Sequence, residues 1–123
     1  GIFYYPMVSV VIPAYNEEKS IITAVNSILE SDYPQNRVEV IVVNDGSTDE
    51  TEIALREFIE LKQVKNVLVV NQINSGKAHA LNKGMKNYST GELLMCLSTT
   101  MLPSTSKSAD SKINLLPGES ERP

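Results

Sequence analysis

Runs of consecutive apolar residues alternate along this chain with stretches in which apolar residues recur at helical spacing. The runs are rich in β-branched residues and nearly continuous in hydrophobicity, which is typical of strands buried on both faces. They predict strands at residues 8–12, 38–43, 67–70 and 92–97. Between them, helices are predicted over residues 17–31, 50–61 and 78–85. This βαβαβαβ order predicts an α/β fold: a parallel sheet with right-handed crossovers and helices on both faces.

Polar residues mark the expected helix starts. Asn16 is placed to cap the first helix, ahead of two glutamates that suit its positive end. Ser47 and Glu50 have the Ser-x-x-Glu spacing of a capping box for the second helix. In the third helix, Gly84 weakens the prediction for the second half.

Composition limits the class of protein. The chain has 123 residues, of which 41% are hydrophobic, and this fits one small globular domain. Cys96 is the only cysteine, which excludes a disulfide-stapled module. The net charge of −4, without a basic cluster, argues against a nucleic-acid partner. No apolar run approaches the roughly 18–20 residues that span a bilayer.

The composition changes near the carboxyl end. Residues 103–123 are rich in serine and proline and carry few apolar side chains, so we expect a disordered tail there. Residues 1–6 form a short apolar flank, and residues 7–102 carry the alternating pattern. The fourth strand would then lie at an open edge. Residues 93–97 would offer a hydrophobic pairing surface, and we expect the chain to self-associate through it.

Candidate binding residues follow the strands, because parallel α/β sheets bind ligands at the carboxyl ends of their strands. Asp45 follows a fully apolar strand and precedes a glycine. Its carboxylate is suited to accept a hydrogen bond from a nucleobase or a ribose hydroxyl. The alternative is an Asp-Gly turn that caps the next helix, and the spacing alone leaves the two readings about equal.

Three other residues have the same ambiguity. Lys77, directly after Gly76 at a helix start, suits a diphosphate, or is a solvated surface lysine. Tyr15 can stack on a base or pack on the sheet edge. Glu17 can bind a ligand or only favour the helix dipole. The single histidine, His79, has no partners at metal-ligand or triad spacing and is assigned to a helix face.

Three segments resemble glycosyltransferase family 2: residues 8–18 (Val-Ser-Val-Val-Ile-Pro-Ala-Tyr-Asn-Glu-Glu), 42–51 (Val-Val-Asn-Asp-Gly-Ser-Thr-Asp-Glu-Thr) and 74–84 (Asn-Ser-Gly-Lys-Ala-His-Ala-Leu-Asn-Lys-Gly). The third is most similar to the processive, membrane-embedded synthases of poly-N-acetylglucosamine, hyaluronan and cellulose. The resemblance covers about residues 7–102. It implies the Rossmann-like, amino-terminal half of a GT-A fold.

The resemblance also implies a function. Family members bind a nucleotide-diphospho-sugar, here expected to be a UDP-sugar, and transfer the sugar with inversion to a glycan acceptor, usually with Mg²⁺ or Mn²⁺. It places this unit on the cytoplasmic face of a membrane-embedded parent. By the same resemblance, Ala14, Tyr15 and Glu17 would line the nucleotide, Asp45 would hold the base, and Lys77 would approach the nucleotide or its diphosphate.

The sequence departs from the family after the fourth strand. Ser98 and Thr100 stand where the family carries the metal-binding Asp-x-Asp, so no metal ligand is assigned. The family's later half, with its acceptor site and catalytic aspartate, has no counterpart. We therefore expect a truncated chain that binds nucleotide at most. The alternatives are an active transferase and an unrelated α/β domain, such as a nucleotidyltransferase, which would need a glycine-rich loop after the first strand.

Overall fold

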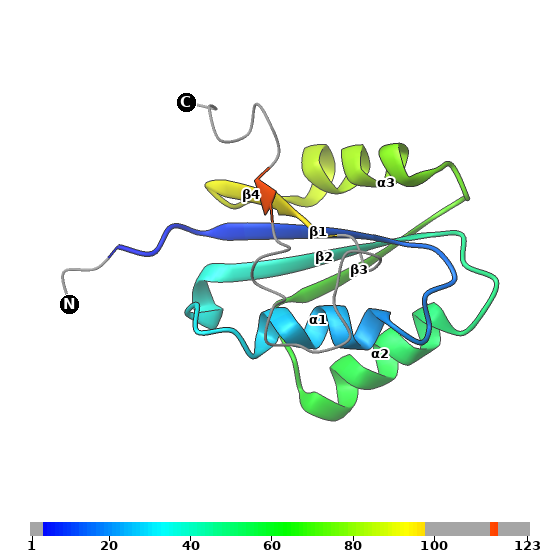
Figure 1. Cartoon of the computed structure of the whole chain (residues 1–123), viewed down its shortest axis with the longest axis horizontal. Helices are drawn as coiled ribbons and strands as arrows, with labels where there is room; N and C mark the ends of the chain where they lie inside the picture. Colours follow the sequence, from blue (N-terminus) through cyan, green and yellow to red (C-terminus); the bar gives the residue numbers. More distant parts are fainter. Residues whose placement is uncertain (1–3, 98–113, 116–123) are drawn as a thin grey trace.

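A computed structural model describes residues 4–97 and 114–115 of the chain (Figure 1). The helices and strands run in the order β1 (Val8–Ala14), α1 (Ile21–Leu29), the 3-10 turn η1 (Gln35–Arg37), β2 (Val38–Asp45), α2 (Thr51–Lys62), β3 (Val67–Gln72), α3 (Lys77–Lys83), the π-helical turn η2 (Gly84–Tyr88), β4 (Leu93–Cys96) and β5 (Asn114–Leu115).

The strands form one sheet in the order β3-β2-β1-β4-β5. The three pairs formed among β1 to β4 are all parallel, as the alternating pattern predicted. The chain passes from β1 through β2 to β3 and then returns to the other side of β1. The strand order therefore reverses between β1 and β4, and their carboxyl ends flank the crevice of such sheets.

Helices cover both faces of the sheet, with α1 and α2 on one side and α3 on the other (Figure 1). Alternate residues of β1 serve the two layers: Val10 and Ile12 pack in the α1 cluster, while Val11 packs with α3 and η2. All three are essentially inaccessible to solvent. Burying one such side chain is worth about 1.5–3 kcal/mol. This explains why the strands are apolar without alternation.

Gly84 explains how the third helical segment comes so close to the sheet. A Cβ on this residue would lie 2.5 Å from Val11 Cγ1 and 3.2 Å from Val43 Cγ2. The segment is continuous through this glycine, but it changes from α-helix to a π-helical turn there. The glycine therefore lets η2 lie against β1 and β2, and does not end the helix.

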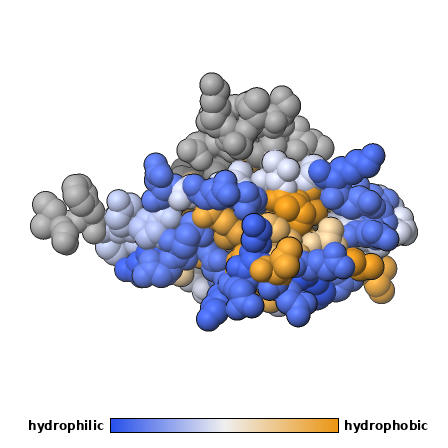
Figure 2. Space-filling model, turned by 90° about the horizontal axis from the view of Figure 1, so that it is seen from below, coloured by the Kyte–Doolittle hydropathy of each residue, from blue (hydrophilic) through white to orange (hydrophobic). Residues whose placement is uncertain are grey.

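The surface over α1 and α2 is mostly polar, with apolar residues showing between polar ones near the middle of this face (Figure 2). On α2 the exposed apolar side chains include Ile53 and Leu61. They are single residues on an otherwise charged helix, which is ordinary for a protein surface.

The capping predictions are wrong at both helix starts. Helix α1 begins at Ile21, and Asn16 lies in the preceding loop with a left-handed backbone (φ 52°). Helix α2 begins at Thr51, so the expected box of Ser47 and Glu50 does not form. These residues instead bond across the two loops: the N–H of Asn16 donates to Ser47 Oγ at 2.9 Å, and the N–H of Glu50 donates to Glu18 Oε1 at 3.0 Å.

The exposed-edge prediction for the fourth strand is wrong at Met95 and Cys96, because β5 pairs with β4 there in the antiparallel sense. Backbone groups at a sheet edge are unpaired, and a short segment from the same chain satisfies them. Residues 114–115 belong to the expected tail, whose other residues lie outside the described part of the chain. Self-association through β4 stays a prediction.

Candidate functional site

The loops that follow β1, β2 and β3 gather at one end of the sheet, at the right of Figure 1. Hydrogen bonds join the first two loops into one unit. The Oδ1 atom of Asn16 accepts from the backbone N–H groups of Thr48 (2.7 Å) and Asp49 (3.2 Å). The N–H of Glu17 donates to Thr51 Oγ1 at 2.9 Å. This fixes Glu17 beside the start of α2.

Asp45 is the last residue of β2 and is only 4% exposed. Its Oδ1 atom accepts from Gln72 Nε2 and from the N–H of Ser75, both at 2.7 Å. Its Oδ2 atom accepts from the N–H of Gly76 at 2.9 Å. The side chain of Asn74 donates to the backbone oxygen of Asp45 at 2.9 Å. One carboxylate thus organises the whole β3–α3 loop.

The Asp45 carboxylate is stabilised in its ionised form. Burial raises the pKa of Asp45, but the hydrogen bonds from Gln72, Ser75 and Gly76 lower it. The nearby charge of His79 lowers it too, and the pKa ends below its usual value. A buried negative charge is therefore present at the end of β2 at neutral pH.

Gly46 is needed where the β2 and β3 loops meet. Its φ is +71°, and a Cβ on it would lie 2.7 Å from the backbone nitrogen of Asn74. In the loop after β3, Gly76 has a φ of +99°. These backbone conformations favour glycine, so glycine is a structural requirement at both positions.

Glu17 and Lys77 lie close enough to interact electrostatically. Burial raises the pKa of Glu17, while a hydrogen bond from Ser20 and the charge of Lys77 lower it, and the net shift is upward. Burial likewise raises the pKa of Cys96 in β4, and Lys77 again opposes the shift. The cation of Lys77 therefore lies near both the loop after β1 and strand β4, where the strand order reverses.

The other two candidates differ in exposure. Tyr15 is 46% exposed, and its ring is available to a ligand. Ala14 is buried in the core cluster of α1, so its methyl group serves packing. The structure thus joins Asp45 to Lys77 through the β3–α3 loop and brings Glu17 near Lys77. Tyr15 lies exposed in the loop after β1.

Sequence reasoning missed Asn16, Thr51 and Gln72 as organisers of the site. The signal for Gln72 is positional: in the ladder of β2 and β3 it pairs with Asp45, two residues beyond the apolar run of β3. An open hollow of about 760 Å³ borders this loop, lined by Gly46, Asn71, Gln72, Ile73, Ser75, His79 and Lys83.

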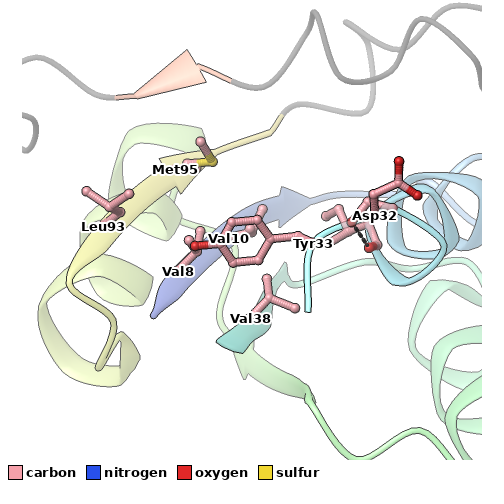
Figure 3. A pocket seen from close by; sticks show the side chains of 9 residues that line it. Val8, Val10, Asp32, Tyr33, Val38, Leu93 and Met95 are labelled. Atoms are coloured by element: carbon pink, nitrogen blue, oxygen red, sulfur yellow. Dashed lines mark hydrogen bonds between the residues drawn. The ribbon is translucent and has the colours of Figure 1, made fainter. Parts of the chain in front are cut away.

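A second cavity lies at the opposite, amino end of the sheet (Figure 3). It has a volume of about 330 Å³ and is lined mainly by apolar side chains, among them Val8, Val38, Leu93 and Met95. Tyr33 points into it, and its hydroxyl group donates to the Pro6 carbonyl at 2.5 Å. Its lining includes no lysine, arginine or histidine that could bind a phosphate.

The donor set of the described residues does not fit a divalent cation. In residues 4–97, no three histidine, cysteine or acidic side chains are grouped so that they could hold a metal ion. Ser98 and Thr100 lie outside the described residues, and their neutral hydroxyls are weak ligands for a hard cation. Over the described part of the chain, no helix is both long and apolar enough to cross a bilayer.

A parallel sheet with charged groups gathered at its carboxyl edge defines a ligand-binding α/β domain. The chain belongs to glycosyltransferase family 2, because residues 9–98 match the family described as Glycosyl transferase family 2. This confirms the resemblance carried by the three segments.

Among its relatives is the poly-beta-1,6-N-acetyl-D-glucosamine synthase of Staphylococcus epidermidis, which is 38% identical over 90 residues. That match covers 73% of this chain and 21% of the relative, so the chain spans about a fifth of that protein's length. A probable glycosyltransferase of Bacillus subtilis, YdaM, is 38% identical over 91 residues, again covering 21% of that protein.

Solved structures agree on the fold. The mannosyltransferase PcManGT from Pyrobaculum calidifontis, in complex with GDP-Man and Mn²⁺, superposes with a TM-score of 0.76 at 35% identity. It covers 85% of this chain and 30% of its own. S. aureus TarS 1–349 in complex with UDP gives 0.65 at 33% identity, over 76% of this chain and 27% of its own. The chain therefore has the Rossmann-like part of the GT-A fold.

Proposed function

We propose that the carboxyl edge of this sheet binds the nucleotide of a nucleotide-diphospho-sugar, with a UDP-sugar as the donor. The observation that carries the proposal is the single loop that joins Asp45 to Lys77. An ionised carboxylate at the end of β2 accepts from the N–H of Gly76, the residue directly before Lys77. The Asp45 carboxylate and the Lys77 ammonium group are thereby held at a fixed separation. This is what a nucleotide requires, since its base would bind the first and its diphosphate the second. TarS and PcManGT, which have this fold, bind UDP and GDP-Man.

Each proposed contact follows from the chemistry of its residue. Asp45 accepts an N–H of the base, and the exposed ring of Tyr15 stacks on it. Ala14 lines the site with its backbone, since its methyl group is buried. Glu17 contacts the ribose, and Lys77 offers its charge to the diphosphate.

Sugar transfer is assigned to the whole protein, on the cytoplasmic face of its membrane. Inversion requires that an acceptor hydroxyl of a glycan attacks the anomeric carbon while the bond to the diphosphate breaks, and that a base takes the hydroxyl proton. The chain shows no counterpart of that base, and the Asp-x-Asp carboxylates are replaced. We therefore propose that this chain binds the nucleotide and does not transfer the sugar.

Calorimetric titration of the chain with UDP, with and without Mn²⁺, tests binding. We expect weak binding that is unchanged by Mn²⁺ and is lost in Lys77→Ala. Transfer of radiolabelled sugar from UDP-N-acetylglucosamine is then measured against a mock control, and we expect none. Transfer above that control would show an active enzyme, while no heat of binding with any nucleotide diphosphate would refute the nucleotide site.

A further inference from the structure

The acceptor positions of the Asp45 carboxylate are already occupied. Besides the bonds at 2.7 Å from Gln72 Nε2 and the Ser75 N–H, and at 2.9 Å from the Gly76 N–H, Asn74 Nδ2 lies 3.5 Å from Oδ2. A carboxylate offers about four lone-pair positions. Since the residue is only 4% exposed, a ligand N–H can reach it only by replacing one of these donors.

Of the three donors within 3 Å of the carboxylate, Gln72 is the one that can leave most readily. Ser75 and Gly76 donate backbone N–H groups, which move only if the loop itself unfolds. Gln72 donates from a side chain, and that side chain borders the open hollow of about 760 Å³. Rotation into the hollow would release Asp45 Oδ1 without moving the backbone.

The bound position of Gln72 is also poorly satisfied. Within the described residues, its Oε1 atom is the one buried side-chain oxygen or nitrogen that has no hydrogen-bond partner. The free-energy cost of leaving Gln72 Oε1 buried without a donor offsets part of the stabilisation that the bond from Gln72 Nε2 to the Asp45 carboxylate contributes. Gln72 is therefore held on Asp45 by a small net interaction, which a ligand can overcome.

We propose that Gln72 is a specificity-determining residue: its amide N–H occupies, in the free protein, the position on Asp45 Oδ1 that the ring N–H of a nucleobase takes on binding. This inference rests on the proposed nucleotide site. The exchange replaces one N–H donor by another and releases the Gln72 amide, with its unpaired oxygen, into the solvated hollow. A base whose ring nitrogen carries no hydrogen offers a lone pair to the carboxylate, and cannot make the exchange.

The test compares UDP with N3-methyl-UDP, which lacks the ring N–H, by calorimetric titration of the full chain. In Gln72→Ala no side chain competes for Asp45, so we expect UDP to bind roughly three-fold tighter, as the small net interaction implies. N3-methyl-UDP should bind equally to both proteins. Asn71→Ala is the matched control, because this neighbouring amide bonds to Asn44 and Glu52 and not to Asp45. It should leave both affinities unchanged.

Gln72→Met keeps the length of the side chain without its polar atoms. It is a second control, because the smaller alanine could change the affinity by loosening the loop. It should show the same gain for UDP, with a thermal melt like that of the parent chain. If UDP binds the parent chain but neither variant binds it more tightly, the role of Gln72 is refuted and the nucleotide site stands. If neither the parent chain nor any variant binds UDP, the proposed nucleotide site and the proposed role of Gln72 are both refuted.

Discussion

Replacing Asp45 by asparagine tests whether one carboxylate organises the β3–α3 loop. The substitution preserves shape and exchanges one acceptor oxygen for an NH₂ group. Whichever way the amide is turned, that group faces a backbone N–H, of Ser75 on one side or of Gly76 on the other. One backbone N–H in a part-buried position is therefore left without its acceptor.

The size of the effect follows from that geometry. An unsatisfied buried N–H costs about 1–3 kcal/mol, and the remaining bonds lose the extra strength given by a charged acceptor. We expect Asp45→Asn to lower the free energy of unfolding by about 2–4 kcal/mol at neutral pH. Gln72 can turn its amide and present its oxygen to the new NH₂ group, which keeps the cost from rising further.

The pH dependence gives the second part of this prediction. The pKa of Asp45 is lower in the folded chain than in the unfolded one. Its contribution to stability is therefore fully present above the unfolded value of about 3.9 and is lost as the pH falls through the folded value. The difference between parent and variant should be largest near pH 7 and should shrink in acid.

Urea denaturation followed by far-ultraviolet circular dichroism measures both effects, since the chain contains no tryptophan. Asp32→Asn is the matched control: the same chemical change at an exposed position, with an expected difference within about 0.5 kcal/mol. Amide hydrogen exchange at Ser75 and Gly76 should quicken only in the Asp45 variant. A loss of stability that is the same at pH 7 and pH 3 would refute the account.

Three further substitutions test other parts of the fold. Gly84→Ala should destabilise the chain by about 1–3 kcal/mol, because the new methyl group meets Val11 Cγ1, and urea denaturation measures this. Thr51→Val should speed hydrogen exchange at the Glu17 amide and cost about 1 kcal/mol, since that N–H loses its acceptor; unchanged exchange would contradict the link between the loops. Leu93→Lys should reduce self-association in sedimentation equilibrium, and a parent chain that is already monomeric at high concentration would contradict the prediction.

The sheet was predictable from the sequence because its long strands β1 and β2 are buried on both faces and the shorter strands beside them are also apolar runs. Each apolar run corresponds to an observed strand, and the helices cover both faces as the alternation requires. Two strands extend further at their carboxyl ends than predicted: β2 continues to Asp45 and β3 to Gln72. Polar residues carry no signal of burial, although the parallel ladder continues through them.

The position of the candidate residues at the carboxyl edge was predictable, but the hydrogen bonds that connect them were not. Glycine and charged residues after the strands marked the edge where a parallel sheet binds ligands. The bonds of Asn16 to the loop after β2 could not be predicted, because its partners lie far away in the sequence. Local rules assigned this residue to a helix cap, which is what an asparagine would do without a neighbouring loop.

The sequence left two roles for Asp45, a ligand acceptor and a cap for the following helix. The structure contradicts the second role, because the following helix, α2, begins at Thr51 without a side-chain cap bond. The carboxylate instead holds the β3–α3 loop by accepting from Ser75 and Gly76, so its roles to compare are loop organiser and ligand acceptor. The two roles conflict only if every acceptor position must stay with the loop. In the proposed exchange, the backbone N–H groups of Ser75 and Gly76 keep holding the loop, and the Gln72 side chain is the donor that leaves. One carboxylate can therefore fix the loop that carries Lys77 and still have one position to exchange with a ligand.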